Sequence, residues 1–314
     1  LRNTTVATEF CLRLIGPVGS LLASAIVMTL ALTAAATCVF HDANHASFST
    51  SRVVNRVAGY TGDLLGASSW IWRFKHNSLH HGNTNMVGID ADIAQAPFAR
   101  LAPQQPWHPW HRYQHLYMWA LYGFLTLQWF LISDFVDLKK HGIGGHRFAR
   151  LPRRRDVVML ALGKVLHAGW AIAVPLAYHR WWVVLIFYLA ISWSVGLLLA
   201  TMFQLAHCAG STEFPAADAP RRGSDFIAHQ LRTTADVHCR TRIGSRILHW
   251  VMGGLDFQVE HHLAPRLPHT VYPLVAERLR RACTQRGLIV HSHPTPWQAV
   301  KSHGRWLKAM GARP

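Results

Sequence analysis

The sequence predicts an all-α integral membrane protein, built from transmembrane helical hairpins with a cytosolic helical cap. Half of its 314 residues are hydrophobic and 15% are charged, whereas about 25% of a typical soluble protein is charged. Several apolar stretches are long enough to cross a bilayer. Histidine occurs 22 times, and many copies form tight groups beside those stretches. We expect a single domain over residues 1–314.

The charge balance favours an anionic membrane partner. Lys and Arg outnumber Asp and Glu by 32 to 15, a net charge of +17, which would attract an anionic bilayer surface or an anionic substrate carrier. We expect no nucleic-acid partner, because the basic residues lie beside apolar spans without a recognition motif. The cysteines form no CxxC pair and are expected to be reduced thiols: Cys11, Cys38, Cys208, Cys239 and Cys283.

Three segments are predicted to span the membrane. Residues 21–40 carry no charge, and about 20 helical residues rise roughly 30 Å, enough to cross the hydrocarbon core. Residues 157–178 and 181–203 are similarly apolar and are separated by His179 and Arg180 alone. We therefore expect these two spans to form a hairpin.

A fourth apolar segment, residues 116–135, is predicted to be an interfacial or re-entrant helix. Histidine groups that serve one site must lie on one side of the membrane, and a crossing here would place the last group opposite the others. The next loop, residues 136–155, contains seven Lys and Arg residues, and the chain after residue 203 is also basic. The positive-inside rule makes both cytosolic.

The positions of these spans predict which residues form the cap and how the two ends of the chain are arranged. The histidine-rich cap covers residues 41–115 and 204–292, with the loop 136–156 beside it. Only one span precedes the first histidine group, and the sequence begins with Leu1; a truncated N-terminus with a lost upstream helix would restore a hairpin. The mostly polar chain after His293 is expected to be loosely ordered.

The histidines fall into three groups, with one further member. They occur in HDANH, KHNSLHHGNTN and DFQVEHHLAPRLPH, and in FQLAHC at the end of the last span. Two histidines four residues apart project from one face of a helix and can hold one ion. The structural alternatives to metal binding are that the first pair are ordinary polar residues at a helix end and that His207 caps a helix. The candidate metal residues are His41, His45, His76, His80, His81, His207, Gln258, His261 and His262.

The side chains of these groups restrict the metal. Imidazole suits Zn, Cu, Fe and Ni, whereas Mg or Ca needs several carboxylates, and the groups offer Asp42 and Glu260 alone. Eight histidines exceed the four positions of one zinc ion, so two octahedral ions fit better. Iron is the plausible metal best suited to activating oxygen. A zinc protease remains a weak alternative, because Asp42 stands where HExxH has its glutamate.

The order HDANH, HNSLHH, QVEHH resembles the membrane fatty acid desaturases, whose boxes HxxxH, HxxxHH and (H/Q)xxHH bind two irons. QVEHH, QLAHC, QLRTT and HHLAPRLPH are similar to the front-end and related acyl desaturases, and the resemblance covers residues 38–285. It implies that the eight histidines are iron ligands. Gln258 occupies a ligand position, although it is a poorer donor than imidazole and can instead hold water or orient a neighbour.

The resemblance also implies roles for residues around the ligands. Candidates for orienting the imidazoles are Asp42, Asn44, Asn77 and Glu260. Stearoyl-type enzymes have an Asn four residues before the position of His207, where this chain has Phe203. This difference leaves one coordination position unassigned, and His238 is a possible substitute.

The activity implied is that of an O2-dependent fatty acyl desaturase. Oxygen would be reduced at two irons, and a cis double bond would form in an acyl chain held in an apolar tunnel, with no catalytic residues beyond the metal ligands. The acyl carrier is open between a lipid, CoA and a carrier protein. Because the sequence has no HPGG and no GxGxxG segment, we expect electrons from a separate ferredoxin or cytochrome b5. The alternatives are a membrane di-iron hydroxylase or oxygenase acting on a lipid, alkane or carotenoid, and a non-catalytic metal-binding membrane protein.

Other polar residues near the membrane are expected to be structural. Lys164 lies within a span, near enough to its cytosolic end to snorkel, and His167 lies three residues later. Aromatic residues of the segment 116–135 are expected to anchor it in the interface. Six histidines are expected at the interface or surface: His108, His111, His115, His141, His146 and His269.

Overall fold

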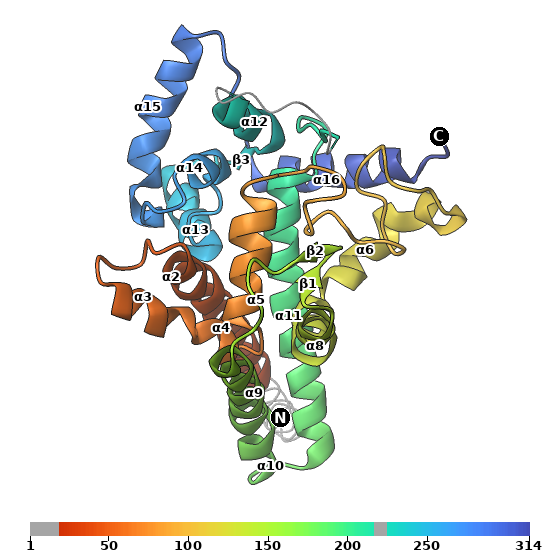
Figure 1. Ribbon diagram of the computed structural model, residues 1–314, viewed down its shortest axis with the longest axis vertical. Coiled ribbons are helices and arrows are strands. Elements are labelled where there is room, and N and C mark those ends of the chain that lie inside the picture. The colour runs from red at the N-terminus through yellow and green to blue at the C-terminus, as the bar shows by residue number, and fades with distance from the viewer. Residues whose placement is uncertain (1–18, 217–224) are drawn as a thin grey trace, which may run out of the picture.

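The structure is a computed structural model that describes residues 19–216 and 225–314, and these are mostly helical (Figure 1). Three helices are long and apolar enough to cross a membrane: Gly19–Asn44, Arg154–Leu176 and Trp181–His207. Two of them contain a span predicted from the sequence, and Arg154–Leu176 covers residues 157–176 of the predicted span 157–178. The expectation of a missing N-terminal helix lies outside the described residues.

The second and third of these helices form the predicted hairpin. The first arm consists of α9 (Arg154–Ala168), a π-helical turn η5 (Gly169–Ala173) and α10 (Val174–Leu176), and the second arm is α11 (Trp181–His207). At 1.5 Å per residue the 27 residues of α11 extend roughly 40 Å, which is longer than the hydrocarbon core. The C-terminal end of α11 is therefore long enough to reach beyond it, and it delivers His207 to the cap.

The fourth apolar segment forms two helices bent by 71° at a short break. The first is η3 (Pro109–Tyr113) with α6 (Gln114–Tyr122), and the second is α7 (Leu125–Gln128), η4 (Trp129–Ser133) and α8 (Asp134–Lys140). At the break Gly123 packs against Trp193, while Gly196 of α11 packs against the Gly123 carbonyl, and a Cβ on either glycine would clash. The break is thus a close backbone contact with α11. The interfacial or re-entrant placement stays a prediction.

Lys164 does not snorkel, contrary to the sequence-based expectation. Its side chain is buried, and Nζ donates to Asp134 Oδ2 at 2.6 Å, to the Gly66 carbonyl at 2.6 Å and to the Trp129 carbonyl at 2.8 Å. Asp134 also accepts the Ser68 N–H at 2.8 Å. A buried charge is stable only when it is paired and hydrogen-bonded, so this lysine joins α9 to the bent pair.

The cap contains short helices and two small sheets. Its first half follows the first span through η1 (Ala35–His41) and α2 (Asp42–Asn44). The sheets pair β1 with β2 antiparallel and β3 with β4 parallel. The remaining elements are α3 (Arg52–Gly59), α4 (Thr61–Leu64), α5 (Ser69–Arg73), η2 (Phe74–His80), β1 (Gly142–Ile143), β2 (His146–Arg147), α12 (Asp225–Thr233), β3 (Asp236–Val237), α13 (Arg242–Met252), α14 (Gln258–Leu263), η6 (His269–Val271), α15 (Tyr272–Gln285), β4 (Ser292–His293) and α16 (Pro296–Gly311).

The chain after His293 is a packed helix, so the expectation of loose order was wrong. In α16 the side chains of Ala299, His303 and Leu307 are completely buried. His303 Nδ1 donates to the Cys208 carbonyl at 2.7 Å, and its Nε2 accepts from the Tyr122 hydroxyl at 2.8 Å. The helix therefore packs against both α6 and the end of α11.

Two of the six histidines expected at the surface are not free there. His111 is buried, its Nδ1 accepting the His108 N–H at 3.1 Å and its Nε2 donating to the Pro97 carbonyl at 2.9 Å. His269 is partly buried, and its Nδ1 lies 2.7 Å from Asp42 Oδ2. Both are structural contacts within the cap.

Candidate metal centre

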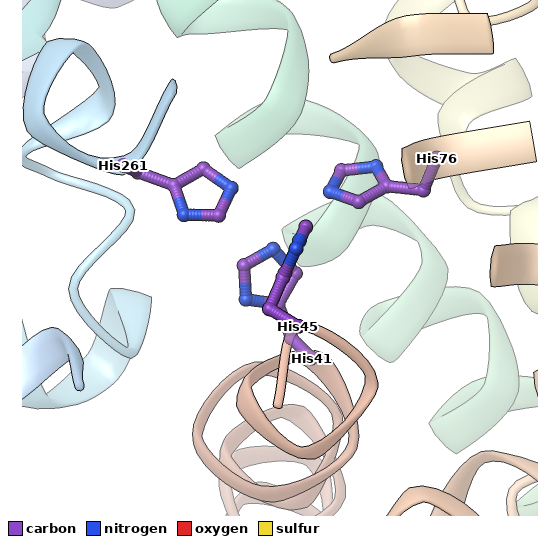
Figure 2. A group of neighbouring side chains, drawn as sticks. All are labelled: His41, His45, His76 and His261. Atoms are coloured by element: carbon purple, nitrogen blue, oxygen red, sulfur yellow. The ribbon is translucent and has the colours of Figure 1, made fainter. Parts of the chain in front are cut away.

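The three histidine groups come together at the top of the first span. Figure 2 shows His41 and His45 rising from the end of that helix, with His76 and His261 facing them from two other segments. One ring nitrogen from each of these four buried side chains lies within 4.8 Å of the corresponding nitrogens of the others. Four imidazole nitrogens at this separation could be bound by one metal ion.

A second group of imidazoles lies beside the first. His80, His207 and His262 are buried, with ring nitrogens again within 4.8 Å of one another. His81 forms a further group with His261 and His262, so it lies between the two larger groups. All eight predicted histidines are therefore brought together, and their role as ligands stays a prediction.

Two of the histidine-bearing segments are π-helical. The sequence had been interpreted as ordinary helix with partners four residues apart. In η2, however, the His81 N–H bonds to the His76 carbonyl five residues earlier at 2.9 Å, and the two imidazole Nε2 atoms lie 3.1 Å apart. η1 likewise ends at His41. Single π-turns of this kind are frequent at functional sites.

Several ring nitrogens on the outer side of the cluster are held by partners that the sequence did not suggest. His80 Nδ1 lies 3.0 Å from Asp90 Oδ2, and Asp90 is held in turn by the Asn85 N–H at 2.8 Å. Burial acts to lower the pKa of His80, but the Asp90 carboxylate outweighs it and the pKa is raised. A carboxylate behind an imidazole fixes its tautomer and increases its basicity as a metal ligand.

His262, His261 and His207 have similar supports. His262 Nδ1 lies 2.9 Å from Gln230 Oε1 and 3.1 Å from the Thr84 hydroxyl. His261 Nδ1 lies 3.1 Å from the Tyr272 hydroxyl, and His207 Nδ1 lies 3.3 Å from the Thr233 carbonyl. The Nε2 atoms of His261 and His262 have no partner among the described residues, whereas His207 Nε2 faces the amide of Gln258.

Within the described residues, most of those predicted to orient the imidazoles make no polar contact with them. Asp42 is the exception, with Oδ1 3.7 Å from His41 Nδ1. Asn44 and Asn77 donate to backbone carbonyls instead. Glu260 is completely buried, and burial together with the nearby Asp236 raises its pKa to about 8.

The cluster has the properties of a metal site. Ring nitrogens without a hydrogen-bond partner among the described residues point into it from His41, His45, His81, His261 and His262. Such buried polar atoms are costly unless something binds them. Burial, reinforced by neighbouring imidazoles, lowers the pKa well below 6.5 for His45, His76, His81, His261 and His262. Neutral imidazoles are the form that binds metals.

Three other residues bear on the coordination sphere. The amide of Gln258 lies 2.9 Å from His207 Nε2, so it faces the second group. His238 is placed elsewhere, 2.6 Å from the Arg280 guanidinium, and is not a substitute for the missing Asn. Asp92, which the sequence did not single out, lies within 4.8 Å of His76 and His80 nitrogens, although Lys75 already pairs with it at 2.8 Å.

An apolar cavity of about 400 Å³ runs between the three candidate spans. It is lined along the first span from Leu21 to Phe40, a rise of roughly 28 Å. Its upper end meets a small space at His41, because Phe40, Trp129 and Leu199 line both. The volume is within the usual range for ligand pockets, about 300–1,000 Å³. A long apolar chain in this cavity would have one end beside the imidazoles.

Comparison with known proteins agrees with this geometry. The family model for fatty acid desaturases matches residues 17–294. The chain is 33% identical over 288 residues to the sn-1 linoleoyl-lipid 6-desaturase of Synechocystis sp., covering 91% of this chain and 79% of the relative. It is 30% identical over 290 residues to the protein of the same description from Arthrospira platensis, covering 92% and 77%. An acyl-lipid (8-3)-desaturase of Physcomitrium patens is 32% identical over 275 residues, covering 86% and 56%.

Proposed function

The chain belongs to the fatty acid desaturase family and is a fatty acyl desaturase, an oxidoreductase of the membrane, and on this premise we propose that it forms a cis double bond in an acyl chain of a membrane lipid, at a di-iron centre. The observation that carries the proposal is the cluster of buried imidazoles with unpartnered nitrogens, one of which, His41, lines the space at the upper end of the apolar cavity.

We assign the ligands to two positions. One is held by His41, His45, His76 and His261, and the other by His80, His207 and His262, with His81 between them and Gln258 beside His207. Eight imidazoles exceed the needs of one zinc ion. A bound iron pair would supply the O2 activation that removes two hydrogens from the acyl chain. Burial keeps most of these imidazoles neutral, and the contacts to Nδ1 would fix the tautomers of His80, His207, His261 and His262.

The cavity positions the substrate and excludes water. An acyl chain along the first span would pass Phe40, Trp129 and Leu199 to reach His41. Orientation of one methylene and exclusion of solvent are the protein's main contributions to such chemistry. The cavity lies between spans, and the relatives named above are described as lipid desaturases, which together favour an acyl lipid over acyl-CoA or an acyl carrier protein as substrate.

We place the site on the cytosolic face of a multi-pass protein. The basic loop between α8 and α9 and the basic chain after α11 favour that side by the positive-inside rule. The histidines before α9 and after α11 meet in one cluster, so two crossings by α9 and α11 require that the bent pair does not cross. A separate ferredoxin or cytochrome b5 would deliver the electrons to this face.

Expression in a host with a defined fatty-acid profile tests the proposal. Gas chromatography and mass spectrometry of the host's fatty acids should reveal a new cis alkene with the wild-type chain and none with His80→Ala or His261→Ala. His291→Ala, outside the cluster, is the matched control and should retain the product. A new alcohol instead of an alkene would make the protein a hydroxylase, and an unchanged profile from iron-loaded protein would leave a metal-binding role.

A further inference from the structure

Two short helices of the cap, α3 and α13, share an unusual surface pattern. Each begins with arginine followed by an aliphatic residue and repeats that pair four residues later: Arg52–Val53 and Arg56–Val57 in α3, Arg242–Ile243 and Arg246–Ile247 in α13. Residues four apart lie on one face of a helix. Each helix therefore has an apolar stripe with an arginine stripe along one edge.

These apolar stripes are exposed. Val53 and Val57 of α3 and Ile243, Ile247 and Trp250 of α13 all expose more than half of their surface. The opposite faces pack on the protein, through Asn55 and Gly59 in α3 and Met252 in α13. Exposed apolar patches bordered by charge mark interaction surfaces.

Both helices contact the same turns of the first span. α3 packs against η1 and α2, and the Gly59 backbone lies against the Asn44 side chain. On the other helix, Gly253 adopts a left-handed conformation (φ 58°) directly after α13, and its backbone lies against Thr37. Both helices thus lie at the height of Ala35–His41, where the first span leaves the membrane.

We propose that α3 and α13 lie in the bilayer interface, with their apolar stripes inserted between lipids and their arginines at the phosphate groups. The occupant is lipid because both stripes lie beside the turns where the first span joins the cap, and because the arginines match an anionic headgroup layer. This placement modifies the predicted cytosolic cap, and it does not depend on the reaction at the metal site. The bilayer would then support the segments that carry His41 and His261 from two sides.

Spin labels report this placement directly in the full-length protein, reconstituted in phosphatidylcholine vesicles containing phosphatidylglycerol. Labels are introduced through Ile243→Cys in α13 and Val53→Cys in α3. Leu274→Cys in α15 is the matched control, because Leu274 and Ile243 are both 72% exposed but α15 packs mainly on α14 and η6. The accessible native thiols Cys38 and Cys239, and Cys11, are replaced by serine.

Collision with apolar oxygen and with a water-soluble nickel chelate distinguishes the outcomes. We expect oxygen to relax the labels at positions 53 and 243 more than nickel does, and the reverse at position 274. Equal nickel accessibility at positions 243 and 274 would overturn the proposal. Protection of position 243 from both reagents would also overturn it, since a protein partner or second copy would then cover the helix.

The arginine stripe has its own test. In the wild type, adding phosphatidylglycerol to the phosphatidylcholine vesicles should move the label at position 243 deeper into the bilayer. Arg246→Gln should make this movement smaller. Arg278→Gln on α15 is the control and should leave the movement unchanged. An identical lipid response in wild type and Arg246→Gln would remove the phosphate contact from the proposal.

Discussion

His261 and His303 are both completely buried, but their ring nitrogens are in opposite situations. His261 Nδ1 contacts the Tyr272 hydroxyl while Nε2 has no partner among the described residues. Both nitrogens of His303 are occupied, one by the Tyr122 hydroxyl and one by the Cys208 carbonyl. His111 and His167 resemble His303, with both nitrogens bonded. Burial alone therefore does not distinguish a structural histidine from a candidate ligand.

Several unpartnered nitrogens close together provide the distinction. Single unpartnered nitrogens also occur at His115, His249 and His293. Within the described residues, none of these three belongs to a group of three or more potential ligands. The energetic cost of leaving buried nitrogens unbonded accumulates only where many of them converge, and a bound metal removes that cost.

The largest expected effect separates His261 from His303 directly. His261→Ala should abolish desaturation and reduce the iron bound per folded protein, because it removes a nitrogen from the cluster. His303→Phe should leave the iron content unchanged while lowering the thermal midpoint, since the Tyr122 hydroxyl and the Cys208 carbonyl lose their partner. Metal analysis and fatty-acid profiling of the monodisperse fraction measure both.

If His303→Phe binds as little iron per folded protein as His261→Ala does, the distinction between the two histidines is wrong. His303→Gln keeps a polar side chain at the position and guards against a variant that does not fold.

A smaller effect is expected from the residues behind the imidazoles. Asp90→Asn retains the shape of the side chain but weakens the support of His80, and loss of such a contact typically costs about 10–100-fold in metal affinity or activity. Asp137→Asn, a carboxylate without a contact to the eight histidines among the described interactions, should retain nearly full activity. Chelator titration of the iron measures the affinity, and equal values for the two variants would show that Asp90 does not act through His80.

The smallest effect concerns pH and stability alone. Burial lowers the pKa of His303 to about 4, against a usual value of 6.5. Below pH 6.5 the unfolded chain binds a proton that the folded chain excludes, so this contribution to stability is complete above pH 6.5 and is lost as the pH falls towards 4. Between pH 7 and pH 5 it amounts to about 2 kcal/mol.

The His303→Phe variant isolates this contribution. Its free energy of unfolding in mild detergent should fall less between pH 7 and pH 5 than that of the wild type, because its position 303 does not titrate. Parallel pH dependences of the two proteins would show that His303 is already protonated, or partly solvated, in the folded state.

The spans and the histidine groups could be predicted from sequence because their signals are local. An uncharged run of 20 residues needs no knowledge of its neighbours, and neither does a spacing of four between histidines. The supports of the imidazoles depend on tertiary contacts instead. Asp90 lies 10 residues from His80, Gln230 lies 32 residues from His262, and nothing in their local sequence indicates those contacts.

The last helix was missed for a different reason. Its composition is polar, but the buried residues Ala299, His303 and Leu307 recur every four residues, which is the narrow apolar stripe of a helix packed on one side. That periodicity was an available signal. The partner of Lys164 was harder to find, since Asp134 lies 30 residues away in a different apolar segment.

The π-helical turns before His41 and within residues 74–80 make the site sensitive to chain length. A π-turn accommodates one more residue than an α-turn. Deleting one residue from η2 would let it relax to α-helix, and the five-residue spacing that brings the Nε2 atoms of His76 and His81 within 3.1 Å would be lost. Single-residue insertions and deletions in these two turns should therefore be more damaging than most point substitutions.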